Sequence, residues 1–264
     1  MKIDKETNET LRRKYNPVGS ELRKLQLREL EILRYVDMVC REHDIPYWLS
    51  GGSCLGAVRH AGFIPWDDDV DIEMLRPDYL RFKKIMAGQP HPDYVFHDMD
   101  SDPNYFLGFG KVRDLHSRLN ETKGFDKNYI YKGCFVDVFP VIPSNSRKLH
   151  SLGILLNMKM MYAMHEGNRV KSMIWKRIFR ISAPVLRFLS SVNAKGRYRY
   201  DIGVSFTETL DYDDISERTG MDFEGIELPV PRRYDSYLTH MYGDYMTLPT
   251  EDNIQIHTTD FEIL

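Results

Sequence analysis

An acidic heptapeptide, Asp67-Asp68-Asp69-Val70-Asp71-Ile72-Glu73, constrains this chain more than any other segment. Its composition predicts a strand, in which side chains alternate between the two faces. Asp67, Asp69, Asp71 and Glu73 would then share one face, with the Cβ atoms of Asp69 and Asp71 about 6.5–7 Å apart. Carboxylates at this spacing repel one another and raise each other's pKa. The segment therefore predicts a divalent cation between them.

Two other interpretations of the acidic segment are less favoured. An EF-hand loop that begins at Asp67 needs glycine at position 6 and glutamate at position 12, but these positions hold Ile72 and Asp78. A solvated acidic loop remains an alternative, although Trp66 and Val70 indicate packing. Neither interpretation explains the segment as well as a metal-binding strand.

A third acidic residue, Asp137, interrupts the apolar segment Phe135–Phe139, which predicts a strand ended by Pro140. An unpaired carboxylate is costly to bury, so Asp137 either faces solvent or joins Asp69 and Asp71 as a third ligand. Three carboxylates with open coordination positions suit Mg²⁺, with Mn²⁺ as an alternative.

A small-residue turn, Gly51-Gly52-Ser53, lies between a predicted strand and a predicted helix. Glycine lets the backbone approach a phosphate, and a helix N-terminus offers free N–H groups. Three cations are candidates for phosphate neutralisation: Arg59, Lys111 and Arg113. The turn can also be an ordinary turn and the cations ordinary surface charges. His60 can act as an acid or base or as a structural loop residue.

Composition limits the class of protein. The 264 residues, 42% of them hydrophobic, suffice for one large domain or a domain with an elaboration. The charged N-terminus and the lack of about 18 consecutive apolar residues predict no signal region and no membrane span. Three scattered cysteines fit neither a zinc site nor a disulfide framework, so we expect reduced thiols in a cytoplasmic protein.

Charge is distributed unevenly. Residues 147–199 carry a net charge of +11, whereas residues 200–264 carry −12. This asymmetry indicates either an anionic partner for the basic segment or mutual pairing of the two segments.

Residues 147–190 predict two helices, which either cap the core or contact anionic lipids peripherally. The apolar residues that would meet lipid are Met158, Met160, Met161, Ile174, Trp175, Ile178, Phe179 and Ile181.

The remaining pattern mixes helices and short strands, which indicates an α/β or α+β fold. Residues 1–19 predict an extended arm and residues 200–222 an irregular polar loop. Apolar spacing predicts a helix from the N-cap Ser20 to about Cys40. Other predicted helices cover residues 54–60, 78–86 and 232–242, and other predicted strands cover 47–50, 94–97, 105–112 and 223–230.

Taken together, Gly51-Gly52-Ser53, Asp69-Val70-Asp71-Ile72 and Val136-Asp137-Val138 resemble the signature of the nucleotidyltransferase superfamily. The longer stretches 50–60 and 62–71 resemble the LicD family more closely, as do 135–140 and 238–245. The resemblance covers about residues 20–143 and 223–250. The gap from Ser53 to Asp69 exceeds that of the minimal superfamily pattern but suits LicD proteins.

The resemblance implies a nucleotidyltransferase-like mixed sheet flanked by helices. We divide the chain into an N-terminal arm (1–19), a catalytic core (20–143), a basic helical insertion (144–199) and a C-terminal strand–helix segment that packs on the core (200–264).

LicD proteins transfer phosphocholine from CDP-choline to glycans such as lipopolysaccharide, and related fukutin-type proteins transfer ribitol phosphate. The resemblance thus implies a metal-dependent transferase that releases CMP. Asp69, Asp71 and Asp137 would hold Mg²⁺, and Asp137 would also act as base. The implied donor-binding residues are Gly51, Gly52, Ser53, Arg59, Lys111 and Arg113.

Alternatives remain open. The same motif could transfer a nucleotide to a small molecule or protein with release of pyrophosphate, or the chain could be a non-catalytic binding module. No residue selects choline over ethanolamine or a polyol. The expected partners are a CDP-linked donor and a glycan acceptor that could be lipid-linked, at the inner face of the membrane, and no nucleic acid.

Overall fold

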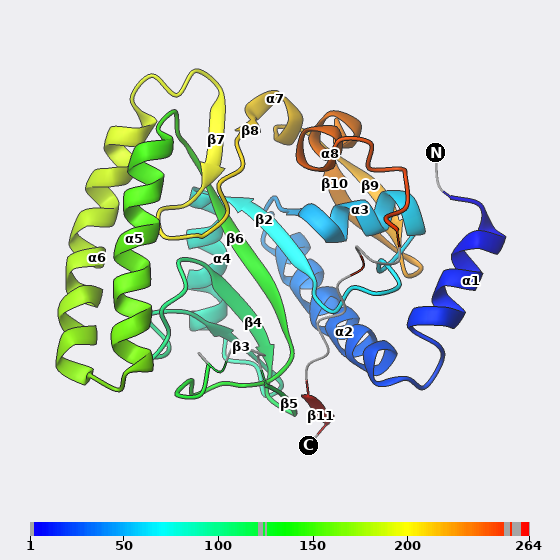
Figure 1. The fold of residues 1–264 in the computed structure, drawn as a ribbon, viewed down its shortest axis with the longest axis horizontal. Coiled ribbons are helices and arrows are strands. Elements are labelled where there is room, and N and C mark those ends of the chain that lie inside the picture. Colours follow the sequence, from blue (N-terminus) through cyan, green and yellow to red (C-terminus); the bar gives the residue numbers. More distant parts are fainter. Residues whose placement is uncertain (1–2, 121–123, 125, 251–253, 255–259, 264) are drawn as a thin grey trace.

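A mixed seven-stranded sheet runs through the computed structural model, which describes residues 3–120, 124, 126–250, 254 and 260–263 (Figure 1). The strand order is β1-β2-β6-β4-β3, and β7 pairs with β6 and β8. Strands β2 and β6 are parallel, and the other pairs are antiparallel. The strands are β1 Trp48–Leu49, β2 Asp71–Leu75, β3 Tyr94–His97, β4 Gly110–Asp114, β6 Phe135–Pro143, β7 Arg197–Tyr200 and β8 Leu210–Asp211.

Helices flank this sheet, as the α/β (α+β) prediction requires. The helices α5 and α6 form a layer on the left of Figure 1, whereas α2 and α3 lie toward its right-hand side. Among the described residues the helices are α1 Lys5–Tyr15, α2 Glu21–Glu42, α3 Gly51–His60, α4 Arg76–Gly88, α5 Arg147–His165, α6 Arg169–Ser191, α7 Tyr212–Ile215 and α8 Tyr234–Tyr242. None of these combines the length and apolar character needed to cross a bilayer.

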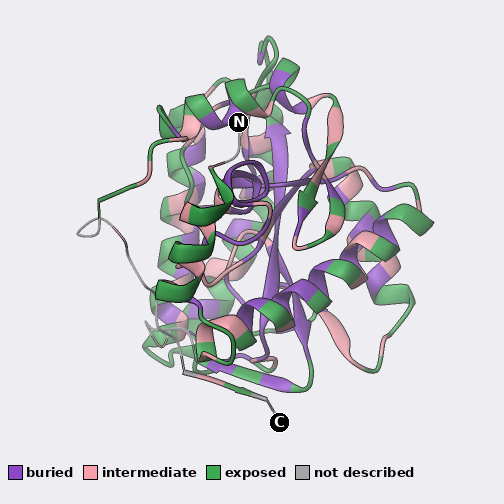
Figure 2. Cartoon of the chain, turned by 90° about the vertical axis from the view of Figure 1, so that its right-hand side faces the viewer, coloured by how far each residue is buried: buried purple, intermediate pink, exposed green. Residues whose placement is uncertain are grey.

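Two smaller sheets complete the fold. A hairpin joins β9 Arg218–Phe223 to β10 Ile226–Pro231, and β5 Ser117–Asn120 pairs with β11 Asp260–Ile263. The main core lies between the sheet and α2, α3 and α4, and the central strands are largely buried (Figure 2). Its fully buried side chains include Leu33 of α2, Ile72 of β2 and Val138 of β6.

Several predicted elements are confirmed. Helix α2 begins after Ser20, whose hydroxyl accepts the N–H of Arg23 at 3.2 Å. The basic segment forms the two helices α5 and α6, and the helix that ends before Gly243 is α8. These elements carry strong helical periodicity or clear cap residues, which act locally.

The prediction of an extended N-terminal arm is wrong. Residues 5–15 form α1, whose N-cap Asp4 accepts the N–H of Thr7 at 2.8 Å. The helix is fixed by tertiary contacts: Arg12 forms an ion pair with Glu224 at 2.9 Å. Few apolar residues reveal this helix in the sequence, because its attachment is polar.

The predicted acidic strand begins later than expected. Strand β2 starts at Asp71, so residues 67–69 form a loop and do not share a strand face with Asp71. The neighbouring strand β1 has only two residues, and Ser50 N–H makes the last contact, to Asp71 O at 2.9 Å. The carbonyl of Asp67 accepts instead from Gln26 Nε2 at 2.8 Å. Without a neighbouring strand to pair with, residues 67–69 remain a loop.

Three other boundaries differ from the predictions. Gly51-Gly52-Ser53 forms the first turn of α3 and not a separate turn. Strand β6 continues through Pro140, because its antiparallel partner changes there from β4 to β7 and the missing N–H costs little. The strand predicted for 105–112 begins only at Gly110.

Residues 200–222 are not an irregular loop throughout, since they contain β8, α7 and most of β9. The strand predicted for 223–230 is instead a hairpin that turns at Glu224 and Gly225, both with positive φ. These elements are short, and pairing with distant segments stabilises them.

Candidate functional site

Three neighbouring strands place charged side chains in one row. Asp71 of β2 lies opposite Asp137 of β6, and Asp137 lies opposite Lys111 of β4. Residues in register on neighbouring strands point to the same face. Lys111 Nζ contacts Asp137 Oδ1 at 2.8 Å, and Asp137 N–H donates to Val70 O at 2.9 Å. The structure therefore brings two of the three predicted metal ligands together.

The third predicted ligand, Asp69, lies in the loop that leads into β2. One carboxylate oxygen each of Asp67, Asp68 and Asp69 lie within 4.8 Å of one another, and all three residues are partly buried. Burial, followed by the charge of Asp69, raises the pKa of Asp67 and of Asp71 well above the usual aspartate value. Asp69 thus links the loop electrostatically to the strand row.

This oxygen-rich set fits a hard divalent cation such as Mg²⁺ or Mn²⁺. The residues that would hold it are Asp67, Asp68 and Asp69, with Asp71 and Asp137 beside them. Asp67 and Asp68 were not among the predicted ligands. They join the cluster because the loop brings consecutive carboxylates together, which a strand would not do.

The first turn of α3 holds the acidic residues in place. Ser53 Oγ accepts the N–H of Asp71 at 2.9 Å. A Cβ at Gly52 would lie 2.9 Å from Asp67 Oδ2, so only glycine lets this carboxylate approach the helix so closely. Gly51 N–H donates to the hydroxyl of Tyr237 at 3.2 Å. Phosphate binding by these three residues stays a prediction, but their contacts show that they position Asp67 and Asp71.

The predicted cations differ in their surroundings. Lys111 contacts Asp137 and lies 3.3 Å from the centre of the Phe135 ring. Arg113 is fully buried, and its Nε donates to His97 Nδ1 at 3.0 Å. Arg59 is buried and donates to Tyr245 O at 2.6 Å. Lys111 is therefore the predicted cation that lies within the acidic row, whereas the hydrogen bonds of Arg59 and Arg113 tie them to the surrounding fold.

His60 is a structural residue in this arrangement. Arg59 Nε donates to His60 Nε2 at 3.0 Å, and the other ring nitrogen faces Asn8 Oδ1 at 2.9 Å. The ring therefore accepts at Nε2 and donates at Nδ1 as a neutral imidazole. It joins α3 to α1, and both of its ring nitrogens are engaged by Arg59 and Asn8.

Glu73 shares the strand face of Asp71, as the sequence predicts, but it is a buried structural anchor. It accepts hydrogen bonds from four side chains on three separate parts of the chain: Trp48 at 2.6 Å, Ser50 at 2.6 Å, Tyr200 at 2.6 Å and Tyr237 at 3.0 Å. A carboxylate with four donors is well satisfied. Glu73 therefore fixes β1, β7 and α8 around β2.

Tyr242 was missed as a site residue, although the sequence marked its segment as similar to the LicD family. Its hydroxyl lies 3.2 Å from where a Cβ of Gly51 would stand. Burial, with the charges of Asp71 and Asp67, raises the pKa of Tyr242. The phenol thus lies beside the acidic cluster, where it can donate a hydrogen bond to a bound group.

Aromatic rings line the strand next to the acidic row. Phe139 follows Asp137 by two residues on β6 and so shares its face. It lies 4.4 Å from Phe109, 5.2 Å from Phe206 and 5.7 Å from Tyr200, measured between ring centres. Phe206 is 43% exposed. The site therefore combines carboxylates, one lysine and an accessible aromatic surface.

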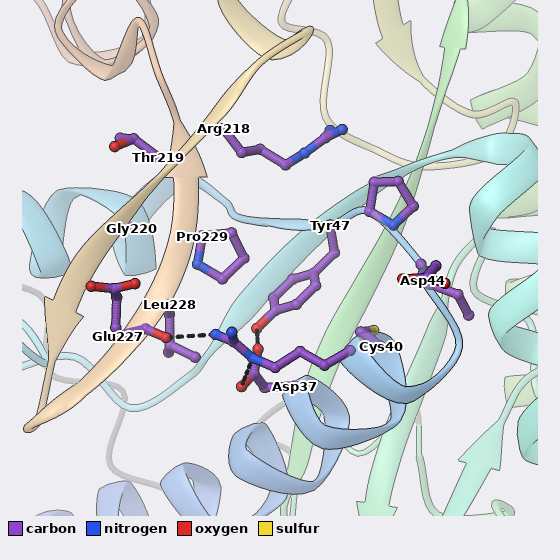
Figure 3. A pocket seen from close by; sticks show the side chains of 13 residues that line it. Asp37, Cys40, Asp44, Tyr47, Arg218, Thr219, Gly220, Glu227, Leu228 and Pro229 are labelled. Atoms are coloured by element: carbon purple, nitrogen blue, oxygen red, sulfur yellow. Dashed lines mark hydrogen bonds and ion pairs between the residues drawn. The ribbon is translucent and has the colours of Figure 1, made fainter.

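A cavity of about 650 Å³ lies elsewhere, between the end of α2 and the β9–β10 hairpin (Figure 3). Asp37 accepts there from Tyr47 at 2.8 Å and from Arg41 at 2.7 Å, and Arg41 also donates to Glu227 O. None of the acidic-cluster residues lines this cavity. Asp37, Tyr47 and Arg41 thus bond to one another, and we assign no function to this cavity.

Comparison with known proteins agrees with this geometry. Residues 44–166 match the LicD family, described as LicD/FKTN/FKRP, nucleotidyltransferase domain. The matched region contains the loop acids, Asp71, Lys111 and Asp137.

Individual relatives match over different lengths. The chain is 28% identical over 265 residues to the lipopolysaccharide cholinephosphotransferase LicD of Haemophilus influenzae, covering 89% of this chain and 97% of that protein. A stretch of 59 residues is 50% identical to the human ribitol 5-phosphate transferase FKRP, covering 22% of this chain and 12% of that protein. Another stretch, of 87 residues, is 31% identical to the mouse ribitol-5-phosphate transferase FKTN, covering 33% of this chain and 16% of that protein.

The chain thus spans nearly all of the bacterial relative but only a small part of the two mammalian proteins. The acidic motif, its strand neighbours and these matches agree: over residues 44–166 the chain is similar to the nucleotidyltransferase domain of the LicD family.

Proposed function

We propose that this protein is a metal-dependent transferase that moves a phospho-alcohol group from a CDP-linked donor to a hydroxyl of a cell-surface glycan. The observation that carries the proposal is the row of Asp71, Asp137 and Lys111 beside the loop acids. Phosphoryl transfer needs charge neutralisation and positioning more than covalent chemistry. The names of the relatives, a cholinephosphotransferase and two ribitol phosphate transferases, support this reaction class.

The residues then have distinct roles. Asp67, Asp68, Asp69 and Asp71 would hold Mg²⁺, which neutralises charge on the donor's diphosphate when bound. Asp137 accepts the proton of the acceptor hydroxyl. The acceptor oxygen bonds to the phosphorus next to the alcohol, the bridging P–O bond breaks, and CMP leaves with that electron pair. Lys111 holds Asp137 in place and adds positive charge at the phosphates.

The aromatic surface favours choline as the alcohol. Rings attract a quaternary ammonium ion through cation–π interactions, and Phe109, Phe139 and Phe206 lie next to Asp137 on the same side of the sheet. Replacing Phe206 with leucine should reduce turnover of CDP-choline and leave CDP-ribitol turnover unchanged. Equal loss with both donors would exclude this role.

Nucleotide transfer remains the second candidate, because the same residues could hold a nucleoside triphosphate. The released product distinguishes the two reactions: CMP for phospho-alcohol transfer and pyrophosphate for nucleotide transfer. The test incubates the protein and Mg²⁺ with CDP-choline, CDP-ethanolamine, CDP-ribitol or CDP-glycerol and a surface-glycan extract. CMP from one donor, lost in Asp69→Asn, supports the proposal. Pyrophosphate from a nucleoside triphosphate, with no CMP, supports nucleotide transfer instead.

We also propose that α5 and α6 contact an anionic membrane surface, at the inner face of the membrane, where a lipid-linked acceptor would be presented. More than half of the exposed large apolar side chains among the described residues lie on these helices or directly after α6. We call them the α5–α6 apolar face: Leu152, Leu155, Met158, Tyr162, Val170, Met173, Ile174, Ile178, Ile181, Val185, Phe188, Leu189 and Val192.

Helical spacing gathers these residues along one side of α6. Val170, Ile174, Ile178, Ile181, Val185 and Phe188 recur every three or four residues, whereas Phe179, Ala183 and Leu186 face the core. Phe179, and likewise Met160 of α5, are therefore buried and cannot meet lipid, contrary to the sequence prediction.

Basic residues surround the α5–α6 apolar face. Exposed cations on the two helices include Arg147, Lys148, Lys159, Lys171 and Arg177, and Glu166 is the one acid between residues 147 and 199. Apolar area flanked by lysine and arginine is typical of helices that lie on anionic lipids. The charge therefore favours a membrane over a neutral protein partner.

Vesicle flotation tests this contact. The protein should float with vesicles that contain phosphatidylglycerol at low salt, and Ile181→Glu should abolish flotation. Leu27→Glu is the matched control, since Leu27 is an exposed apolar residue on α2. Absence of flotation by the unaltered protein would exclude the membrane contact.

A further inference from the structure

Glu29 is a buried acid whose carboxylate has no hydrogen-bond partner among the described residues. It lies on α2, its exposed fraction is 0%, and both Oε1 and Oε2 lack a donor. Buried polar groups in folded proteins nearly always have partners, and an unpaired buried carboxylate is costly. The contrast with Glu73, which is equally buried but accepts four hydrogen bonds, shows that this fold can satisfy a buried acid.

The position of Glu29 on α2 directs it toward the acidic loop. Gln26 precedes it by three residues and so lies on the same face of the helix. The amide of Gln26 donates to Asp67 O at 2.8 Å. This face of α2 therefore packs directly against the loop.

The electrostatics agree with this direction. After burial, the charges that raise the pKa of Glu29 most are those of Asp69, Asp68, Asp67 and Asp71, in that order. The negative charges of these four aspartates act on Glu29, which makes its lack of a donor still more unfavourable. A cation between Glu29 and the loop would give the Glu29 carboxylate a partner and would offset its repulsion from the aspartates.

We propose that Glu29 is a further ligand, directly or through one bound water, of the divalent cation held by Asp67, Asp68 and Asp69. This inference rests on the metal dependence within the proposed function. Glu29 comes from a 22-residue helix in the core, so it would anchor the cation to a rigid element. Carboxylate oxygens from the helix and the loop together suit Mg²⁺ or Mn²⁺.

Binding of Mn²⁺ without any donor tests the proposal. In a titration followed by electron paramagnetic resonance, Glu29→Gln should bind Mn²⁺ at least about tenfold more weakly than the unaltered protein. Glu31→Gln is the matched control, because Glu31 lies on the same helix but is exposed and pairs with Arg28. Glu31→Gln should bind Mn²⁺ like the unaltered protein.

Two outcomes would overturn the proposal. If Glu29 is simply a neutral buried acid, Glu29→Gln will be folded and will bind Mn²⁺ with unchanged affinity. If the unaltered protein binds no Mn²⁺ saturably, the cation site itself is absent.

A second measurement does not depend on folding of the variant. The unaltered protein, labelled with ¹³C at glutamate carboxylates only, is loaded with Mn²⁺ and studied by electron–nuclear double resonance. The proposal predicts a ¹³C coupling from a glutamate carboxylate close to the ion. An ion held by aspartates alone would show none, which would overturn the proposal.

These measurements distinguish failure of the Glu29 proposal from failure of the proposed function. CMP release with unchanged Mn²⁺ binding in Glu29→Gln would exclude only the role of Glu29. A glutamate coupling together with weaker binding in Glu29→Gln, but without turnover of any CDP donor, would support the ligand and exclude the reaction.

Discussion

Asp69 connects the two halves of the acidic site. Its charge is the largest after burial among those that raise the pKa of Asp67 and of Asp71. Asp69→Asn keeps the side-chain size but removes the charge that a cation would meet. We expect turnover to fall by several orders of magnitude while the circular dichroism spectrum is unchanged. Asp44→Asn, at an exposed position, is the control. Normal turnover in a folded Asp69→Asn would contradict the assignment.

His60 predicts a specific pH dependence of stability. Burial, then the charges of Arg59 and Arg12, lowers its pKa to about 3. Below the ordinary histidine pKa, the unfolded chain takes up a proton that the folded chain excludes. Stability therefore falls as pH drops from about 6.5 toward 3, by about 1.4 kcal/mol per pH unit from this residue.

Urea unfolding of the protein and of His60→Gln at pH 7.5, 6 and 5 measures this effect. The variant should depend less steeply on pH, because glutamine does not titrate. Parallel curves for the two proteins would show that His60 is not held neutral in the fold.

The neighbouring positions of Asp71 and Asp137 agree with a choice made from the sequence, where each acid stands between apolar residues of a predicted strand. Their role as metal ligands stays a prediction. Glu29 could not be chosen in this way, because on α2 it is one acid among others in an amphipathic pattern. Only the folded structure shows that this position is buried and faces the loop.

At the scale of elements, the first turn of α3 sets the position of the acidic loop. A Cβ at Gly52 would come within 2.9 Å of Asp67 Oδ2. Gly52→Ala should therefore displace this carboxylate and weaken Mn²⁺ binding, with little loss of helix. Gly88→Ala is the control, since a Cβ at Gly88 of α4 meets nothing within 4 Å. Equal Mn²⁺ affinity in both variants would show that the close approach does not matter.

Elements with a local signal were predictable, and elements fixed by distant partners were not. Ser20 and the apolar spacing of α2 define that helix within one segment. The start of β2 depends instead on the length of β1, and the passage of β6 through Pro140 depends on a change of partner strand. A sequence pattern carries no direct information on either.

At the scale of the whole molecule, ion pairs join the N-terminal helices α1 and α2 to the β9–β10 hairpin. Glu224, in the β9–β10 turn, pairs with Arg12 of α1 at 2.9 Å and with Arg23 of α2 at 2.6 Å. Its side chain is 7% exposed, so loss of its charge leaves Arg12 and Arg23 without their shared anionic partner. Glu224→Gln should lower the free energy of unfolding by about 3 kcal/mol.

The matched control is Glu217→Gln, because the Glu217–Arg232 pair is exposed on both sides. An exposed pair contributes at most about 1 kcal/mol. Equal unfolding free energies for the two variants would mean that Glu224 does not join the N-terminal helices to the hairpin.

The overall α/β class followed from the sequence, because segments with helical and strand patterns are mixed along the chain. The strand order did not, since it depends on contacts between residues far apart, such as Asp71 with Asp137. The polar docking of α1 likewise leaves no apolar pattern in the sequence.

The most direct test of the proposed reaction uses CDP-choline labelled with ³²P at one phosphate at a time. With Mg²⁺ and a glycan acceptor, the phosphate next to choline should appear on the glycan, and the phosphate next to cytidine should appear in CMP. Asp69→Asn should abolish both. Transfer of the cytidine-linked phosphate to the acceptor would contradict the proposal and identify a nucleotide transferase.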